Sequence, residues 1–487
     1  MQTKHQMLPL RLLGPGVLLG WHFLILYFPL DAAANVTEHT LLLRQVALNC
    51  SLFVFFLASA LLIEKISQRG HVTTTPFVTI VASIAVLGGI GVIVTPPLLG
   101  DAGTIVSVAF MGSGEATLML LWLRFYADVA ISYAGRYLAA STAIGALICF
   151  FARCLTFEAS LIVFVALPLL SAAMLLVASR TDLFRENEEG GKGLSDWPSA
   201  RGPFMKSTAQ LIIFSIAFGL LQGCVSSGST LLPVANPIAM LGVGIAGAAV
   251  VALYQSSPIA PDLRPVHKAS LLLFSAGVLA IPFSSSLISH LAAVAIMTGF
   301  LLYDILILIF TIDLIRTFDL RPAPVLGLNR SCEYAGFTIG ICLGYFVWNH
   351  FSTMGEFPYL LSSVTAFVSF AAALFLMTEK NIWHAKVYVT EPAGKAEECA
   401  RENPASTFDI HQSACENVCT RFALTPRERE VFMLLSKGRN AEYIQSALCI
   451  SSHTVKTHIS NIYKKIDVHS AQELLDAIDR EQEGAGR

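Results

Sequence analysis

Long apolar runs separated by short polar segments dominate the first 378 residues of the chain. A helix that spans a bilayer needs about 20 consecutive apolar residues, and twelve stretches approach that length. They cover residues 12–30, 46–63, 76–95, 103–123, 138–152, 160–179, 208–227, 237–254, 269–285, 287–312, 334–348 and 358–377. Beyond residue 378 the pattern becomes that of a soluble sequence. The pattern therefore predicts an all-α protein with a twelve-helix membrane bundle and a soluble C-terminal part.

Composition and charge support this division and orient the bundle. Only 14% of the 487 residues are charged, against about a quarter in soluble domains. With the N-terminus inside, the external segments hold two basic residues, Arg44 and Arg153, and the cytoplasmic segments hold sixteen. These sixteen are Lys4, Arg11, Lys65, Arg69, Arg124, Arg136, Arg180, Arg185, Lys192, Arg201, Lys206, Arg264, Lys268, Arg316, Arg321 and Arg330. The positive-inside rule then places both termini in the cytoplasm.

A cleavable signal peptide is the alternative interpretation of the N-terminus, because Ala32, Ala33 and Ala34 resemble a cleavage site. The apolar stretch before these alanines is long for a signal peptide. Cleavage would in any case leave the C-terminal part inside the cell.

The longest hydrophilic interruption, residues 180–207, divides the membrane part into halves of 167 and 170 residues. Two six-helix halves joined by a charged cytoplasmic loop resemble the major facilitator superfamily in architecture. The resemblance implies a cavity between the halves at the bilayer midplane. The loop between the second and third runs, residues 64–71, lacks the superfamily's usual glycine and Asp-Arg signature, which speaks against transport.

Four polar residues fall near the middle of apolar runs, where an ionisable group needs a partner or a cavity. They are His22, Glu115, Gln222 and Asp304, in the first, fourth, seventh and tenth runs. In facilitator folds these four helices line the central cavity. With Trp21 and Tyr303 as aromatic walls, the residues predict a small-molecule pocket.

The alternative is internal pairing, for instance of Glu115 with His22, that only fixes helix packing. Asp313 and Glu333, next to Arg316 and Arg330, are expected to form loop ion pairs near the cytoplasmic interface. Cys415 and Cys419 are expected to be small packing residues rather than a redox or metal pair.

Residues 424–478 show the spacing of a helix-turn-helix domain. Thr425, Pro426 and Glu428 form a capping box with proline at the first helical position. Asn440 and Ser451 begin two further expected helices. In the last of these, Val455, Ile459, Ile462 and Ile466 form one apolar stripe. The opposite side carries Ser452, His453, Lys456, Thr457, Ser460, Tyr463 and Lys464.

Residues 451–466 include three lysines and no acids, and a cationic, hydrogen-bonding helix face suits the major groove of DNA. The segments Leu424–Val431, Thr454–His458 and Ile462–Ile466 resemble the LuxR-type helix-turn-helix family. The resemblance implies a four-helix DNA-binding domain in which Lys456 and His458 contact DNA and a last helix, about residues 470–479, dimerises. Asp467 and Ala471 depart from the family pattern without undermining the fold.

The sequence thus predicts three parts: a transmembrane sensor (1–378), a cytoplasmic linker (379–420) and a LuxR-type DNA-binding domain (421–487). It resembles membrane-bound one-component regulators of the bacterial inner membrane. The expected DNA-binding residues are Ser452, His453, Lys456, Thr457, His458, Ser460 and Lys464, and the expected ligand-binding residues are Trp21, His22, Glu115, Gln222, Tyr303 and Asp304.

The expected partners are promoter DNA, a small-molecule ligand, the bilayer and a second copy of the chain on DNA, with RNA polymerase as a further candidate. No catalytic, metal or cofactor constellation is found in the sequence, so an enzyme is not predicted. The alternative function is a transporter-like transceptor that also moves its ligand.

Overall fold

The computed structural model describes residues 10–27, 38–67, 73–129, 131–180, 197–226, 237–256, 263–283, 286–376, 415, 417–419, 421–436, 452–466, 468 and 473–474. The chain forms two compact units, Met1–Val387 and Tyr388–Arg487. The described residues of the first unit form a short 3-10 helix, η1 (Leu10–Leu13), and a helical bundle without strands.

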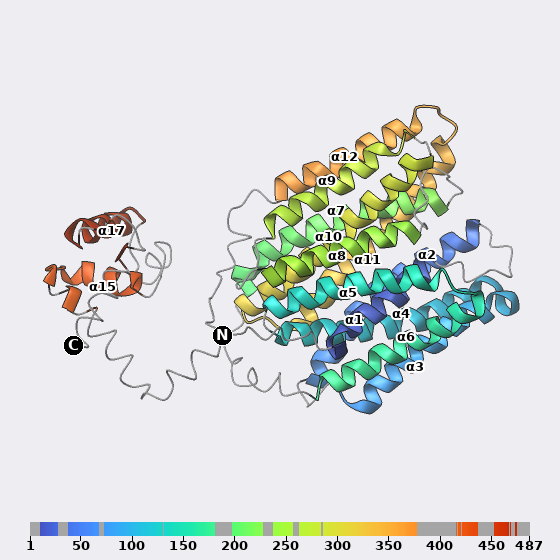
Figure 1. The fold of residues 1–487 in the computed structure, drawn as a ribbon, viewed down its shortest axis with the longest axis horizontal. Coiled ribbons are helices and arrows are strands. Elements are labelled where there is room, and N and C mark those ends of the chain that lie inside the picture. Colours follow the sequence, from blue (N-terminus) through green and yellow to red (C-terminus); the bar gives the residue numbers. More distant parts are fainter. Residues whose placement is uncertain are drawn as a thin grey trace. The chain divides into compact units, whose positions relative to one another are not determined.

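The bundle contains a helix at each predicted apolar run (Figure 1). The helices are α1 (Gly14–Tyr27), α2 (Glu38–Ser67), α3 (Thr75–Val94), α4 (Pro96–Asp128), α5 (Ile131–Ala152), α6 (Phe157–Ala178), α7 (Trp197–Ser226), α8 (Pro237–Ser256), α9 (Arg264–Ala280), α10 (Ser286–Thr317), α11 (Pro322–Phe351) and α12 (Phe357–Leu376). Within the described residues, eight helices are long and apolar enough to cross a membrane, and three shorter apolar helices lie at Leu10–Leu26, Pro265–Ala280 and Phe357–Ala371. The first unit is therefore a multi-pass membrane bundle.

Helix α11 corrects one prediction about its region. The expected run began at residue 334, but α11 begins twelve residues earlier, at Pro322. Arg330 and Glu333 therefore lie inside a helix, 5% and 4% exposed, and not in a cytoplasmic loop. A polar stretch does not end a helix when its side chains find partners within the bundle, as these do. Arg330 is consequently not one of the cytoplasmic loop cations.

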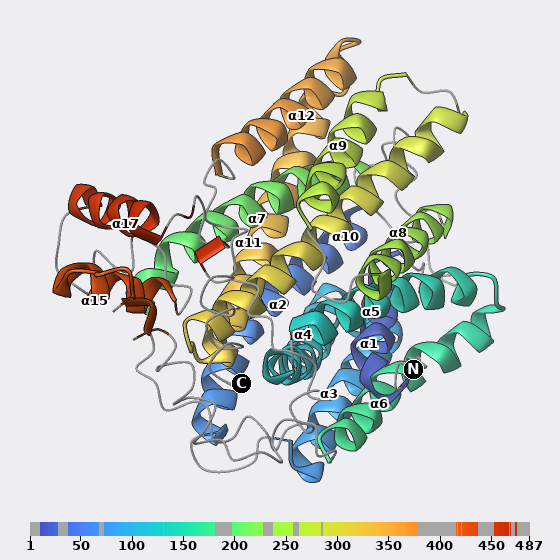
Figure 2. The same cartoon turned by 60° about the vertical axis from the view of Figure 1, so that its left-hand side comes forward.

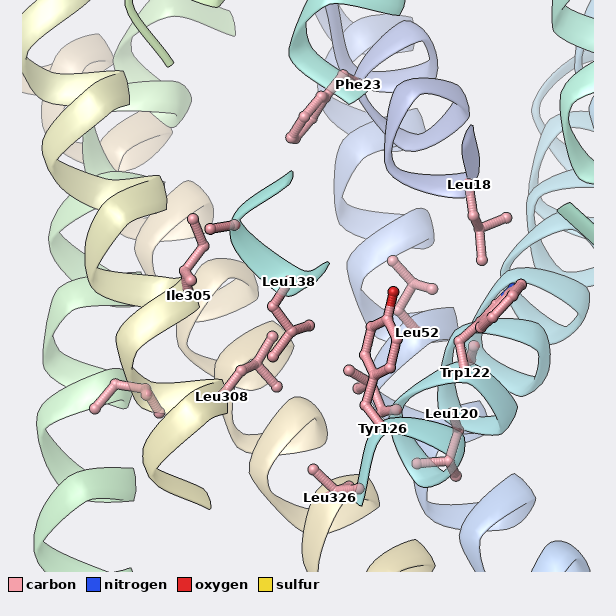
Figure 3. Close-up of a cluster of buried hydrophobic side chains, with 14 of the residues drawn as sticks. Leu18, Phe23, Leu52, Leu120, Trp122, Tyr126, Leu138, Ile305, Leu308 and Leu326 are labelled. Atoms are coloured by element: carbon pink, nitrogen blue, oxygen red, sulfur yellow. The ribbon is translucent and has the colours of Figure 1, made fainter. Parts of the chain in front are cut away.

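Two six-helix halves pack against each other along two helix pairs. Contacts of α2 with α11 and of α5 with α8 join α1–α6 to α7–α12, and Figure 2 shows both pairs. Apolar side chains of both halves fill one continuous core, including Leu52 and Leu138 from the first half and Ile305 and Leu308 from the second (Figure 3). The core therefore holds the two halves as one unit.

Two buried polar groups of the first half form hydrogen bonds between elements. The Tyr126 hydroxyl donates to the Leu12 carbonyl oxygen over 2.6 Å. The Trp122 indole N–H donates to Ser171 Oγ over 3.0 Å. Each of these bonds ties a large, fully buried ring to a neighbouring element, so the first half is fixed by polar contacts as well as by packing.

Glycines let α7 and α11 approach at backbone distance. A Cβ atom on Gly340 would lie 2.3 Å from the carbonyl oxygen of Ile216, and one on Gly344 would lie 2.0 Å from that of Leu220. Such contacts are the means by which membrane helices pack closely, because lipid supplies no hydrophobic driving force between them.

We expect Gly340→Ala to destabilise the bundle by about 1–3 kcal/mol, since the new methyl group meets backbone that can move only with its helix. The measurement is the midpoint of thermal unfolding of the full chain in detergent. Gly202→Ala is the matched control, because a Cβ at Gly202 of α7 meets nothing within 4 Å. An unchanged midpoint for Gly340→Ala would contradict the close packing of α7 and α11.

The described helices of the second unit are α15 (Pro426–Leu435) and α17 (Ser452–Ile466). Val455, Ile462 and Ile466 of the predicted stripe are buried, with Ile459 packed beside them. Cys415 and Cys419 lie in the same core, 0% and 1% exposed, as expected of packing residues. The packed core thus begins within the segment predicted to be a linker. The predicted second helix near residues 440–448 falls outside the described residues, as does most of the last helix.

Candidate functional site

A cavity lies between the two halves of the membrane unit. Its lining comes from α1, α2, α4 and α5 of the first half and from α7, α10 and α11 of the second. The volume open to the centres of water molecules is about 80 Å³. This is room for roughly half a dozen waters. Three of the predicted ligand-binding residues, His22, Gln222 and Asp304, line it.

Glu115 is the partner of His22. Its Oε1 contacts His22 Nδ1 between α4 and α1, and the pair is buried, with side chains 3% and 11% exposed. The other oxygen, Glu115 Oε2, is buried without a hydrogen-bond partner in the described part of the protein. The pairing predicted as an alternative to a ligand site therefore exists, and His22 also faces the cavity.

Trp21 and Tyr303 do not form the aromatic walls of the cavity that the sequence predicted. Trp21 packs on Phe164 of α6, with ring centroids 5.6 Å apart. Tyr303 stacks on Phe214 of α7 at 4.4 Å. Neither belongs to the cavity lining, because a neighbour in sequence points about 100° away around a helix. The aromatic wall comes instead from residues such as Phe56 and Tyr334.

A buried ion cluster on α10 and α11 forms the other side of the cavity. Arg330 Nη1 lies 2.7 Å from Asp304 Oδ1 and 2.5 Å from Glu333 Oε2. Arg330 Nη2 donates to Asn329 Oδ1 over 3.0 Å. Asp304, Arg330 and Glu333 all line the cavity. Of these three, only Asp304 was predicted from the sequence as a cavity residue. The spacing of three residues between Arg330 and Glu333 on one helix could have signalled an internal ion pair.

Tyr334 lies between the two charged groups. Its ring stacks on Phe56 with centroids 5.5 Å apart and an interplanar angle of 12°, and it meets the His22 ring edge-on at 6.2 Å. Since His22 and Phe56 belong to the first half and Tyr334 to the second, this aromatic contact joins the halves at the cavity wall.

In the second unit, the predicted capping box begins α15. Glu428 Oε2 accepts from the Thr425 backbone N–H over 2.9 Å, and Thr425 Oγ1 accepts from the Glu428 backbone N–H. The same Glu428 oxygen accepts from Lys465 Nζ over 2.6 Å. Lys465 therefore connects α17 to the start of α15, and its charge serves the packing of the two helices.

All the predicted DNA-binding residues belong to α17, and the structure describes the side chains of four of them. Thr457, Ser460 and Lys464 are exposed and His458 is half-buried. Ser452, His453 and Lys456 belong to the helix, but their side chains lie outside the described residues. Asn461 is a further exposed polar residue on α17 that the prediction omitted. The described part of α17 thus has one packed side and one exposed polar side.

Comparison with known proteins assigns this unit. The family of bacterial regulatory proteins, luxR family, matches residues 423–478. The uncharacterized response regulatory protein YgeK of Escherichia coli is 39% identical over 77 residues, 15% of this chain and 52% of YgeK. The response regulator protein VraR of Staphylococcus aureus is 49% identical over 45 residues, 9% of this chain and 22% of VraR. Residues 423–478 are a LuxR-family helix-turn-helix domain.

The chain spans about half the length of YgeK and less of VraR, so the likeness to these two relatives is confined to the LuxR-type domain. The membrane unit resembles the human organic anion transporter MFSD10, with a TM-score of 0.52 and 12% identity over 75% of this chain and 98% of that one. At that identity the likeness concerns the fold alone. The chain therefore joins a major-facilitator-like membrane bundle to a LuxR-type domain.

The pKa of Glu428 in the LuxR-type domain is lowered from its ordinary value of 4.5. Burial alone would raise this pKa, but hydrogen bonds from Lys465 and Thr425 to the charged carboxylate outweigh burial. A lowered pKa in the folded state means that Glu428 stabilises the domain above pH 4.5. This contribution is lost as the pH falls through the pKa of the folded state.

We expect Glu428→Gln to lower the free energy of unfolding of the LuxR-type domain by about 1 kcal/mol at pH 7, because the amide keeps the cap but loses the charge. The difference from wild type should shrink as the pH falls from 4.5, where the unfolded carboxylate binds its proton, through the lower pKa of the folded state. Urea unfolding of residues 388–487, a separate compact unit, measures both effects. Glu430→Gln is the control, because Glu430 pairs with Arg427 at the surface. A pH-independent difference would contradict the role of Glu428.

Proposed function

We propose that the protein is a membrane-bound one-component transcriptional regulator that senses a small molecule through its membrane bundle. The proposal rests on one observation. A single chain contains a LuxR-family domain and a major-facilitator-like bundle whose cavity is lined by charged side chains. The names of YgeK and VraR describe response regulators, and the proposal gives no residue of this chain a catalytic role.

The proposed DNA-reading surface is the polar side of α17, with Ser452, His453, Lys456, Thr457, His458, Ser460 and Lys464 facing the major groove. The exposure of Thr457, Ser460 and Lys464 supports this placement. Two copies are proposed to meet through the last helix, about residues 470–479, and to bind promoter DNA as a dimer. RNA polymerase is a further proposed partner.

The proposed sensor site is the cavity near His22, Glu115, Gln222 and Asp304, extended to Arg330 and Glu333. Because the cavity is shared by the halves, a ligand that fits one arrangement of the halves better shifts the bundle towards that arrangement. The basic residues of the loops favour cytoplasmic termini in a bacterial inner membrane. In that orientation the LuxR-type domain is on the side of the DNA.

We expect Lys456→Ala to reduce promoter occupancy by the full chain, because a base or phosphate contact of a recognition helix is worth about 1–3 kcal/mol, roughly 5- to 150-fold in affinity. Chromatin immunoprecipitation of the tagged chain identifies the bound promoters. Gel shifts of those fragments with purified full chain then measure affinity.

Arg429→Ala is the matched control, since Arg429 is an exposed cation of the same domain on α15. Membrane abundance of each variant, measured by immunoblot, excludes a folding defect. Normal occupancy for Lys456→Ala at normal abundance would count against α17 as the DNA-reading helix.

A transceptor is the second candidate function, and the likeness of the bundle to a transporter fold favours it. Uptake into vesicles containing the full chain separates the candidates, with the compound that alters promoter occupancy as the solute. We expect saturable binding without accumulation above the level in empty vesicles, because residues 64–71 lack the facilitator loop signature. Accumulation would establish the transceptor instead.

A further inference from the structure

When every carboxyl group is ionised, the charges at the cavity do not balance. Of the lining residues, Asp304 and Glu333 carry carboxyl groups, Arg330 carries a guanidinium and His22 an imidazole. Glu115, which contacts His22, adds a third carboxyl group. With all three carboxylates ionised and His22 protonated, one negative charge remains in excess, and two remain if His22 is neutral. In a low-dielectric interior an uncompensated charge of this kind is costly.

The carboxylates of Asp304 and Glu333 are also close to each other. Asp304 Oδ1 lies 2.7 Å and Glu333 Oε2 lies 2.5 Å from the same nitrogen of Arg330. The distance between these two carboxylate oxygens is therefore at most the sum of the two. Two carboxylates at that separation repel each other, and a single guanidinium neutralises only one of them. Glu333 Oε2 contacts Arg330 without hydrogen-bond alignment, so this carboxylate is only partly satisfied.

Arg330 is poorly placed to bind an anion. Its Nη1 lies against two carboxylates and its Nη2 donates to Asn329, so among the described residues only its buried Nε lacks a partner. No lysine and no other arginine belongs to the described lining of the cavity. An anionic ligand would therefore meet carboxylates with no uncommitted cation to neutralise it.

The rest of the lining suits the body of an organic cation. Phe23, Phe56, Phe218, Phe300, Tyr334 and Phe337 surround the cavity. The faces of aromatic rings attract cations within about 6 Å. A metal ion is less suited, because no group of three or more His, Cys, Asp and Glu side chains is placed to hold one within the part of the chain that the structure describes.

We propose that the central cavity binds a small organic cation, an ammonium group with an apolar or aromatic body, next to Asp304 and Glu333. This inference rests on the proposed function, since it names the class of ligand that the sensor site takes. The ammonium group supplies the missing positive charge, and the aromatic side chains hold the remainder of the molecule. The fold relative MFSD10 is named for organic anions, and the cavity of this chain has the opposite charge preference.

The test compares three probes of similar size and different charge: benzylammonium, benzyl alcohol and benzoate. Each is titrated into the purified full chain in detergent, and the midpoint of thermal unfolding is recorded. Benzylammonium should raise the midpoint saturably, by about 2–4 °C at a hundred times its dissociation constant, since binding to the folded state alone stabilises it. Tetramethylammonium, which donates no hydrogen bond, should also raise the midpoint. Benzyl alcohol and benzoate should not.

Asp304→Asn and Glu333→Gln remove one negative charge each and should abolish the benzylammonium shift. Two variants are used because either could weaken the hold on Arg330 and fail to fold. Glu158→Gln is the matched control, as Glu158 is an exposed acid at the start of α6, and it should keep the full shift.

Three results would overturn the proposal: an equal or larger shift with benzoate, an undiminished benzylammonium shift in every folded cavity variant, or no shift with either ammonium probe. Each of these leaves the effect of Lys456→Ala on promoter occupancy untouched, so the ligand class and the proposed function fail separately. Benzylammonium binding combined with normal promoter occupancy by Lys456→Ala would retain the ligand class and reject the DNA-reading helix.

Discussion

The cost of burying charge in a bilayer is the constraint on which the membrane unit depends. A charged side chain at the centre of a lone transmembrane helix costs several kcal/mol. This bundle buries Glu115, Arg330 and Glu333 and holds the half-buried Asp304 beside Arg330. Each of these side chains contacts an oppositely charged or polar side chain, either on another helix or one turn away on the same helix. The ion pairs join α1 to α4 and α10 to α11. The need to pair these charges therefore determines which helices face the centre of the bundle. The position of the cavity follows from that arrangement.

Most of the fold could be predicted from the sequence, because the apolar runs and the helix spacing patterns both depend on residues that are close together in the chain. Apolar runs mark the helices, and the structure has a helix at each of the twelve. The capping box at Thr425 and the stripe from Val455 to Ile466 are likewise set by spacing along one helix, and both are observed. Half of the predicted cavity set, His22, Gln222 and Asp304, lines the cavity, because a polar side chain in the middle of an apolar run must face either a cavity or a polar partner.

The remainder could not be predicted, because it depends on the direction in which a side chain points and on what it meets. Trp21 and Tyr303 are adjacent in sequence to cavity residues but turn into the helix packing of their own halves. Arg330 and Glu333 looked like loop charges because the polar stretch before residue 334 interrupts the apolar run. Only the proximity of Asp304, 26 residues away, makes that stretch compatible with a buried helix. Pairing across helices is non-local information that hydropathy along one chain does not contain.

In the proposed sensor, a cavity shared by two halves makes the charged lining matter more for ligand response than the apolar lining. A ligand shifts a conformational equilibrium only by the difference between its affinities for the two states, and moving a population from 1:99 to 99:1 takes about 5.5 kcal/mol. A methylene group contributes about 0.8 kcal/mol on full burial, and a rearrangement that keeps it buried changes little of that. Two unit charges about 4 Å apart interact by about 4 kcal/mol at the effective dielectric of a protein, and this energy falls by half when their distance doubles. A ligand charge held between carboxylates of one half and aromatic rings of the other is therefore the part of the complex whose energy depends most on the arrangement of the bundle.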